Sequence, residues 1–321
     1  MSALLKGRAS FGRRLLTWYD AHKRDLPWRK DRDPYRVWLS EIMLQQTRVA
    51  AVIAKYEEFL RLFPTIEHLA EAPQSAVLAA WSGLGYYRRA RAMHTAAQKI
   101  VHERGSVLPR TAEAWRELPG IGRYTAAAIA SIAFGEKAAV VDGNVERVAE
   151  RLTGKHLPAA DVWALAENLL SPERPGDFNQ AMMELGATIC VPGEPKCSEC
   201  PVARLCATRG KLANQRKQQR TTKVTVFYAL DCTRGKVRLT RRSGTATVMP
   251  SMWELPEITS EANDLEVFLK LKHAIMNTKY DVRVMQTALQ EGTGTRVPVA
   301  RLGEMPLTGL ARKILRAAAI L

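Results

Sequence analysis

The feature that most constrains this chain is a run of four cysteines within 17 residues, spaced Cys190-x6-Cys197-x2-Cys200-x5-Cys206. Four thiolates at short, unequal spacings can wrap a compact metal centre. Structural zinc sites usually pair two C-x2-4-C knuckles, and only one such pair occurs here, so an iron–sulfur cubane suits the set better. Zinc, and four buried cysteines without a metal, are the alternatives. We interpret Cys232, outside the run, as an ordinary thiol.

The charge balance points to a polyanionic partner. The 321 residues include 48 Lys and Arg against 32 Asp and Glu, a net charge of +16. Such an excess favours nucleic acid over a membrane surface. Residues 201–223 alone carry seven basic residues and no acidic one. A hydrophobic content of 46% with 25% charged residues is that of a globular protein.

Nothing in the sequence predicts a membrane protein or a secreted one. No apolar run approaches the ~20 residues of a membrane span. The opening residues 1–6 are too short to be the core of a signal peptide. We therefore expect an intracellular protein, and we expect it to act as a monomer. In a bacterium it would be cytoplasmic and associated with the nucleoid.

The hydrophobic pattern divides the chain into a helical part and a mixed part. We predict helices over 10–23, 34–44, 50–63, 66–72, 75–83, 88–104, from 143, and over 160–170, with a helical hairpin at 118–134. After a basic linker at 211–223, we predict strands at 224–230, 237–240, 280–285 and 295–299, with helices at 261–271 and 308–319. The expected domains are residues 1–210, mainly α, and residues 224–321, α+β.

Residues 118–134 combine a glycine turn with an alanine-rich helix. Gly120 and Gly122 allow tight or positive-φ backbone, and the bare amides at the helix start suit an anion. Asp142 follows closely, at the start of the next helix. An anion site beside a carboxylate suggests phosphate contact plus chemistry. The plainer interpretation is an αα-hairpin with Asp142 as a helix N-cap.

Glu41 lies within the run Val37-Trp-Leu-Ser-Glu-Ile-Met-Leu44, which is apolar on nearly every face of a helix. Burial raises the pKa of a carboxyl group and keeps it protonated near neutral pH. The sequence therefore predicts a buried general acid here, rather than a solvated surface charge.

These features together resemble the endonuclease III superfamily of DNA glycosylases, and within it the adenine-specific MutY branch. The resemblance covers residues 10–210 and rests on Leu26-Pro-Trp-Arg29, Trp38-Leu-Ser-Glu-Ile-Met-Leu-Gln-Gln-Thr47, Gly83-Leu-Gly-Tyr-Tyr87, Leu118-Pro-Gly-Ile-Gly-Arg-Tyr124, Val141-Asp-Gly-Asn-Val145 and Ala181-Met-Met-Glu-Leu-Gly186. It implies a two-part helix–hairpin–helix glycosylase domain whose loop 190–206 holds a [4Fe-4S] cluster, mainly as a structural element.

The resemblance also implies catalytic roles. Glu41 would protonate N7 of adenine, and Asp142 would stabilise or trap the cationic sugar, as in two-carboxylate glycoside hydrolysis. Asn144 would orient Asp142. Tyr124 stands where strand-nicking relatives carry a Schiff-base lysine, which favours a hydrolase that uses water. By resemblance, Tyr124 would form its hydrogen bond near Asp142.

An enzyme that acts on a base within a duplex must flip that base out of the helix. The resemblance makes Gln46 the intercalating residue and Tyr86 the wedge beside the opposite base, and it makes Leu26, Arg29 and Glu184 adenine-pocket residues. Gly120 and Gly122 would hold a phosphate. The remaining candidates for phosphate contacts are basic: Arg88, Arg89, Arg91 and Lys196.

The second domain resembles the Nudix-like domain of the same branch through Met252-Trp-Glu-Leu-Pro256 and residues 306–315. The sequence contains no Arg-Glu-x-x-Glu-Glu metal box, so we expect no nucleotide hydrolysis. The family's lesion-recognition loop ends in Ser-His or Thr-His, whereas Met276-Asn277 occupies that place here. Asn277 can still donate and accept hydrogen bonds, and Thr278 or His273 could supply the missing contacts.

We therefore expect a monofunctional adenine DNA glycosylase of base excision repair. Its partner would be double-stranded DNA containing A:8-oxoguanine or A:G mispairs. One alternative is a related enzyme for another mispair, such as thymine opposite guanine. The other is a non-catalytic iron–sulfur protein that binds damaged DNA, against which the joint presence of Glu41, Tyr124 and Asp142 argues.

Overall fold

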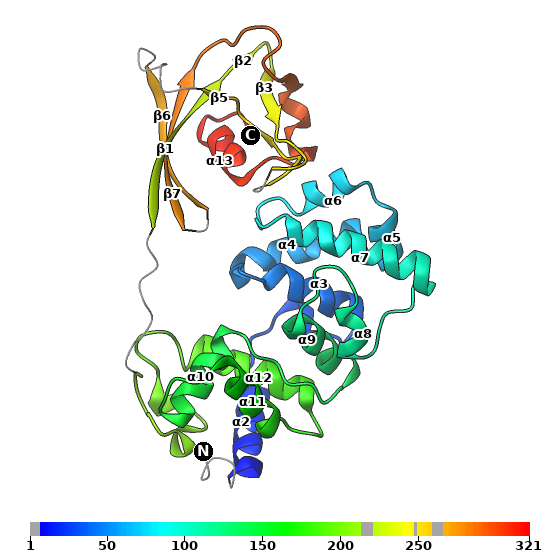
Figure 1. Cartoon of the computed structure of the whole chain (residues 1–321), viewed down its shortest axis with the longest axis vertical. Helices are drawn as coiled ribbons and strands as arrows, with labels where there is room; N and C mark the ends of the chain where they lie inside the picture. Colours follow the sequence, from blue (N-terminus) through cyan, green and yellow to red (C-terminus); the bar gives the residue numbers. More distant parts are fainter. Residues whose placement is uncertain (1–6, 213–220, 247–248, 259–265, 276) are drawn as a thin grey trace. The chain divides into compact units, whose positions relative to one another are not determined.

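The computed structural model describes residues 7–212, 221–246, 249–258, 266–275 and 277–321 (Figure 1). The chain forms two compact units. The first comprises residues up to 57 together with 65–70 and 95–215, and the second comprises 58–64, 71–94 and 216–321.

The chain is helical up to residue 188, as the sequence predicts. The helices are α2 (Arg8–His22), α3 (Pro34–Leu44), α4 (Val49–Leu62), α5 (Ile66–Glu71), α6 (Gln74–Ala80), α7 (Arg88–Arg104), α8 (Ala112–Arg116), α9 (Arg123–Phe134), α10 (Gly143–Thr153), α11 (Ala159–Leu169) and α12 (Pro175–Thr188). Short 3-10 turns lie at η1 (Pro27–Arg29), η2 (Cys197–Glu199) and η3 (Ala203–Leu205). Two of these helices, α8 and α12, are absent from the sequence prediction.

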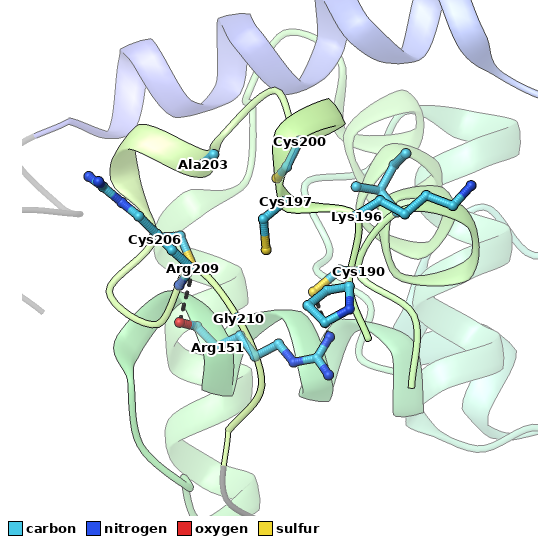
Figure 2. A pocket seen from close by; sticks show the side chains of 11 residues that line it. Arg151, Cys190, Lys196, Cys197, Cys200, Ala203, Cys206, Arg209 and Gly210 are labelled. Atoms are coloured by element: carbon cyan, nitrogen blue, oxygen red, sulfur yellow. Dashed lines mark hydrogen bonds between the residues drawn. The ribbon is translucent and has the colours of Figure 1, made fainter. Parts of the chain in front are cut away.

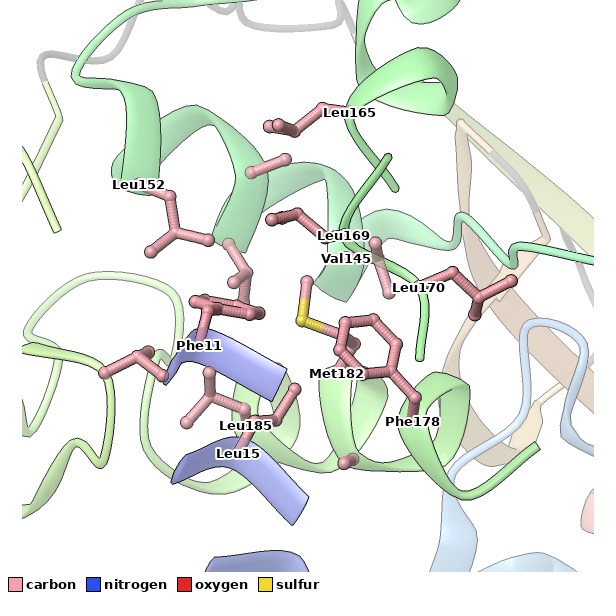
Figure 3. Packing of buried hydrophobic residues seen from close by; sticks show 14 of the residues in the cluster. Phe11, Leu15, Val145, Leu152, Leu165, Leu169, Leu170, Phe178, Met182 and Leu185 are labelled. Atoms are coloured by element: carbon pink, nitrogen blue, oxygen red, sulfur yellow. The ribbon is translucent and has the colours of Figure 1, made fainter. Parts of the chain in front are cut away.

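A hydrophobic core joins α2, α10, α11 and α12 in the first unit (Figure 3). Phe11 and Leu15 of α2 pack with Val145 of α10 and with Phe178 and Leu185 of α12. Three of the four clustered cysteines, Cys190, Cys200 and Cys206, pack against the edge of this core. The loop that carries them is therefore part of the folded unit.

The glycine turn connects α8 to α9 as a helix–hairpin–helix. The Thr111 hydroxyl caps α8 by accepting from the Ala114 amide at 3.3 Å. Gly120 has a φ of 76°, a left-handed conformation that favours glycine. Gly122, the N-cap of α9, instead has ordinary extended backbone (φ −90°, ψ 178°). Positive φ is thus required at one of the two glycines and not at the other.

The C-terminal part of the second unit contains two sheets and a helix. Its elements are β1 (Thr222–Leu230), β2 (Cys232–Thr233), β3 (Lys236–Arg241), β4 (Trp253–Glu254), β5 (Glu257–Ile258), β6 (Val267–Ile275), β7 (Thr278–Gln286), β8 (Thr295–Pro298), η5 (Val299–Glu304) and α13 (Gly309–Ala317). One sheet has the order β5-β1-β7-β6; in the other, β3 pairs with β2, β4 and β8. The predicted α+β character is confirmed, and half-buried Cys232 packs against this core.

One predicted helix is wrong. Of residues 261–271, the part from Val267 onward belongs to strand β6, which pairs antiparallel with β7; residues 261–265 lie outside the described residues. Leucine and lysine are good helix formers, which favoured the helix. Val267, Leu269 and Leu271 nevertheless alternate with exposed residues, and pairing with β7 overrides the local preference.

No helix in the described ranges is long and apolar enough to cross a membrane.

Packing between α12 and α9 gives a first prediction. A Cβ added at Gly176 would lie 2.5 Å from the Ser131 carbonyl oxygen and 2.7 Å from the Ile132 Cα. We expect Gly176→Ala to lower the free energy of unfolding by about 2 kcal/mol, because the clash is with backbone. Thermal unfolding followed by circular dichroism measures the effect. The matched control is Gly12→Ala on α2, where nothing lies within 4 Å; it should be neutral or stabilising, and equal losses would contradict the explanation.

Candidate active site

Glu41 is a buried carboxylic acid held by one tyrosine. It lies on α3 and is only 6% exposed. The Tyr124 hydroxyl, in the first turn of α9, donates to Glu41 Oε2 at 2.9 Å. Burial raises the pKa of Glu41 to about 7; the tyrosine hydrogen bond opposes the shift and the nearby Asp142 carboxylate adds to it. Glu41 is therefore protonated in a large fraction of molecules at neutral pH.

Tyr124 stays a hydrogen-bond donor at every physiological pH. Burial, together with the carboxylates of Glu41 and Asp142, raises its pKa well above the usual value. Its hydroxyl also contacts the sulfur of Met183 at 3.3 Å. The hydrogen bond expected near Asp142 goes to Glu41, and the Asp142 carboxylate is close enough to affect the pKa of both groups.

Asp142 is the N-cap of α10, and its two oxygens have separate partners. Oδ1 accepts from the backbone amides of Asn144 and Val145 at 2.9 and 2.8 Å. Oδ2 accepts from the Asn144 side-chain amide at 2.9 Å. Helix capping and contact with a substrate are thus compatible. Oδ1 accepts two hydrogen bonds, whereas Oδ2 accepts one and can take another. The expected contact between Asn144 and Asp142 is present.

Two side chains outside the sequence prediction hold this segment in place. Asn179 of α12 is buried; it accepts from the Val140 amide at 3.2 Å and donates to the Ala138 carbonyl at 2.8 Å. It therefore fixes the extended stretch that leads to Asp142. Arg147 donates to Asn144 Oδ1 at 2.7 Å and to the Cys190 carbonyl at 2.8 Å, so it joins the Asp142 environment to the cysteine loop.

Glu184 is an ion-paired carboxylate whose pKa is shifted downward, whereas the pKa of Glu41 is shifted upward. Its Oε1 accepts from the Arg24 amide and Nε at 3.2 and 2.7 Å. Its Oε2 accepts from Arg24 Nη2 and Arg29 Nη2, both at 2.8 Å. Burial opposes its ionisation, but these arginine contacts prevail and lower the pKa of Glu184 to about 2. Buried Leu26 lies between the two arginines in sequence.

Four acceptor contacts occupy both oxygens of Glu184. The carboxylate therefore fixes Arg24 and Arg29. Arg29 is also close enough to Glu41 for its charge to lower the pKa of that carboxyl group slightly. The predicted pocket residues Arg29 and Glu184 thus act as one ion-paired group.

The four clustered cysteines line one pocket (Figure 2). Their thiols are free. Arg151 Nη1 donates to Cys190 Sγ at 3.4 Å, and the Arg209 amide donates to Cys206 Sγ at 3.5 Å. Burial raises the pKa of the Cys200 thiol to about 11, so this sulfur needs a bound cation to ionise at neutral pH.

The donor set fits a thiolate-ligated group, since four sulfurs share a pocket that also supplies N–H donors to two of them. Within the described part of the chain, no three His, Cys, Asp or Glu side chains are already arranged to coordinate a metal ion. The pocket brings the ligands together, and their final geometry would form with the bound group.

Comparisons with known proteins indicate the family. A family profile described as "HhH-GPD superfamily base excision DNA repair protein" matches residues 39–162. The adenine DNA glycosylase of Homo sapiens is 50% identical over 216 residues, which cover 63% of this chain and 40% of that protein. A solved thermostable thymine-DNA glycosylase is 35% identical with a TM-score of 0.60, covering 64% of this chain and 97% of that one.

The chain belongs to the HhH-GPD superfamily. An adenine DNA glycosylase of Buchnera aphidicola is 37% identical over 202 residues, 61% of this chain and 57% of that protein. The chain therefore spans about half the length of the curated relatives it matches, or less. An endonuclease III–DNA complex, 22% identical with a TM-score of 0.54, shares the fold.

In this HhH-GPD protein, both predicted DNA-inserting residues have unusual backbone. Gln46 and Tyr86 are exposed and have φ values of 56° and 47°. Left-handed backbone is unfavourable for residues other than glycine and concentrates at functional sites. Gln46 lies just after α3, where neighbouring Gln45 donates from Nε2 to Thr125 Oγ1 of α9 at 3.0 Å.

The predicted phosphate contacts divide into two groups. Arg88 and Lys196 are exposed, as phosphate binding requires. Arg91 is partly buried and donates to the Pro250 carbonyl. Arg89 is only 7% exposed, and its guanidinium contacts the carbonyls of Leu84 and Gly85. The expectation for Arg89 is therefore corrected, because a buried guanidinium bound to its own loop is not directed at a phosphate.

Asn277 is exposed in the turn between β6 and β7, with Thr278 at the start of β7 and His273 within β6. Met276 lies outside the described residues. His273 and Thr278, the alternative contacts, thus lie on the paired strands β6 and β7.

A second prediction follows from the burial of Glu41. Its pKa rises from 4.5 to about 7 on folding. The folded state binds this proton more tightly than the unfolded state. The free energy of unfolding therefore falls as pH rises from 4.5 to about 7. We expect Glu41→Gln to stabilise the protein by about 1–3 kcal/mol above pH 7 and by almost nothing near pH 4.5.

Thermal unfolding at pH 5 and pH 8.5 measures this difference. Glu103→Gln, at an exposed glutamate of α7, is the control and should show no pH-dependent gain. A Glu41→Gln effect that is the same at both pH values would mean that burial of the charge does not govern Glu41.

Proposed function

We propose that this chain is a monofunctional adenine DNA glycosylase of base excision repair. It would flip out and hydrolyse adenine mispaired with 8-oxoguanine or guanine in double-stranded DNA. The observation that carries the proposal is the buried Glu41, with a pKa near 7 and a hydrogen bond from Tyr124. Its relatives named adenine DNA glycosylase support it.

The first step removes the base. Glu41 transfers its proton to N7 of the flipped adenine, and the C1′–N9 bond breaks with its electron pair moving to the base. Tyr124 occupies Oε2 of Glu41, so the transferable proton is carried by Oε1. A general acid is most effective when its pKa lies near the working pH.

The second step concerns the sugar. The departing adenine leaves positive charge on C1′ and the ring oxygen, and the Asp142 carboxylate stabilises it or traps it as a covalent ester. Oδ2 has the freer lone pairs, since Oδ1 accepts two backbone amides. Water then adds at C1′ and its proton leaves to solvent, giving an abasic site; where the ester has formed, its C1′–O bond breaks and the Asp142 carboxylate is released. Tyr124 has no amine to form a Schiff base, so the strand stays intact.

The chemistry of Glu41 favours adenine over thymine. A protonated carboxyl group needs a basic ring nitrogen on the leaving base, which adenine has at N7 and thymine lacks. The likeness to a thymine-DNA glycosylase at 35% identity keeps thymine opposite guanine as the second candidate. The two candidates differ in substrate and not in the role of Asp142.

We assign DNA contacts by the same resemblance. Gln46 and Tyr86 would enter the duplex, and Arg29, oriented by Glu184, would contact the flipped base together with Leu26. The amides near Gly120 and Gly122 would hold a backbone phosphate at the start of α9, with Arg88 and Lys196 adding phosphate contacts. The net charge of +16 supports such a partner.

Cys190, Cys197, Cys200 and Cys206 would hold a [4Fe-4S] cluster. Iron–sulfur clusters are typical of the adenine glycosylases that this chain resembles. Bound there, the cluster would cross-link the 190–206 loop. With four cysteine ligands it would leave no obvious open iron position, so we expect no direct role in hydrolysis. Arg151 would donate a hydrogen bond to the sulfur of Cys190. Lys196, on the same loop, would be held in position for its phosphate contact.

The C-terminal residues 224–321 would form the Nudix-like domain that reads the base opposite adenine, with Asn277 as its candidate contact. Residues 1–210 would be the glycosylase domain and 211–223 the linker.

Single-turnover cleavage tests the function. Duplexes carrying A:8-oxoguanine, A:G, T:G and A:T are incubated with excess protein, and released base is measured. We expect release of adenine from both mispairs, and a loss of at least a hundredfold for Asp142→Asn. Preference for T:G would select the second candidate, and full activity of Asp142→Asn would exclude its proposed role.

Metal analysis tests the cluster. We expect about four iron atoms per chain and visible absorbance in anaerobically purified protein, and loss of both in Cys197→Ser. Cys232→Ser, outside the set, is the control and should retain both. Zinc without iron would overturn the assignment.

A further inference from the structure

The Tyr86 loop has a backbone that does not form without support. Tyr86 has a φ of 47°, and Gly83 and Gly85 just before it have φ values of 99° and 68°. The glycines adopt this conformation readily, but tyrosine does not. Tyr86 is also the exposed side chain of this stretch that would enter DNA. Something nearby must therefore stabilise the loop before DNA arrives.

Arg89, the second residue of α7, makes the contacts that could do so. Its Nη2 donates to the Leu84 carbonyl at 3.1 Å and to the Gly85 carbonyl at 3.2 Å. Its guanidinium lies 5.4 Å from the centre of the Tyr86 ring and 5.5 Å from the centre of the Trp81 ring. One side chain thus binds the loop backbone and also contacts the aromatic ring of Tyr86 by a cation–π interaction.

Trp81 completes the arrangement from the other side. Its Nε1 donates to the same Gly85 carbonyl at 3.1 Å, and its ring is fully buried. Two donors therefore converge on one oxygen at the base of the loop. Burial lowers the pKa of Arg89 to about 10, so the guanidinium is still charged at neutral pH.

We propose that Arg89 is a positioning residue that holds Tyr86 in its DNA-inserting conformation. This rests on the proposed function, in which Tyr86 enters the duplex beside the base opposite adenine. One nitrogen of the planar guanidinium, Nη2, reaches both carbonyls while the group also contacts the Tyr86 ring, and the compact lysine ammonium does not reproduce this geometry. Arg88, the exposed neighbour, would instead meet phosphate, so adjacent arginines have different tasks.

The test uses the full chain in four forms: wild type, Arg89→Lys, Tyr86→Ala and the double variant. Each also carries Asp142→Asn to keep the substrate intact. They bind a duplex with an A:G mispair and 2-aminopurine next to the guanine, which brightens when unstacked. We expect wild type to raise the fluorescence, and both single variants and the double variant to lose most of the rise equally.

Equal loss in the double variant means that Arg89 acts through Tyr86, since independent effects would add. Arg104→Lys, at the other end of α7, is the matched control and should keep the rise. A second expectation concerns salt. Arg89→Lys should leave the salt dependence of binding unchanged, whereas Arg88→Ala should reduce its slope by about one, as loss of one phosphate contact does.

Additive losses, or a reduced salt slope in Arg89→Lys, would overturn the proposal. Should Arg89→Lys fail to fold by circular dichroism, Trp81→Phe removes the other donor to Gly85 and must show the same loss, or the proposal fails. The fluorescence does not depend on base release. A wild-type rise without adenine release from the parent enzyme would therefore refute the function alone and leave the positioning of Tyr86 supported.

Discussion

The hydrogen bond between Tyr124 and Glu41 is the interaction on which the rest of the site depends. It joins α3 to α9 and is made by a carboxyl group that the core would otherwise keep neutral. Burial alone would raise the pKa of Glu41 further, and the tyrosine bond opposes that rise. The balance leaves the pKa of Glu41 near neutral pH, where the carboxyl group can both carry a proton and give it up. A fully exposed or a fully unpaired carboxyl group could not do this.

Helix α12 provides much of the scaffold around that bond. Asn179 fixes the stretch that leads to Asp142, Met183 contacts Tyr124, and Glu184 holds two arginines. Asn179 and Met183 lie one helical turn apart and Glu184 directly follows Met183, so one short stretch of the helix contacts several parts of the site. Arg147 adds a connection from Asn144 to the Cys190 carbonyl. The position of Asp142 is therefore set by contacts among residues distant in sequence.

This explains which features could be predicted from sequence. An acid within an apolar helical run is a local signal, so the sequence predicts that Glu41 is buried. The spacing of the four cysteines is also a local signal, and it predicts a shared site. Asn179 and Arg147 carry no local signal, since an asparagine or arginine on a helix is ordinary until its partner is known. The predicted helix at 261–271 is wrong for a related reason, because pairing with β7 decides the conformation of strand Val267–Ile275.

Arg89 shows how the same limit affects function. From sequence it belongs to a basic group with Arg88 and Arg91, and phosphate is the natural partner for such a group. Burial separates it from Arg88, and its contacts are to the loop that precedes it. An exposed aromatic residue in left-handed backbone would relax if nothing opposed it, and its insertion into DNA would then include the cost of ordering it. In the proposed role of Arg89, its buried guanidinium offsets that cost in advance. Insertion of Tyr86 then needs both a loop that is rigid at its base and an aromatic side chain that is exposed at its tip.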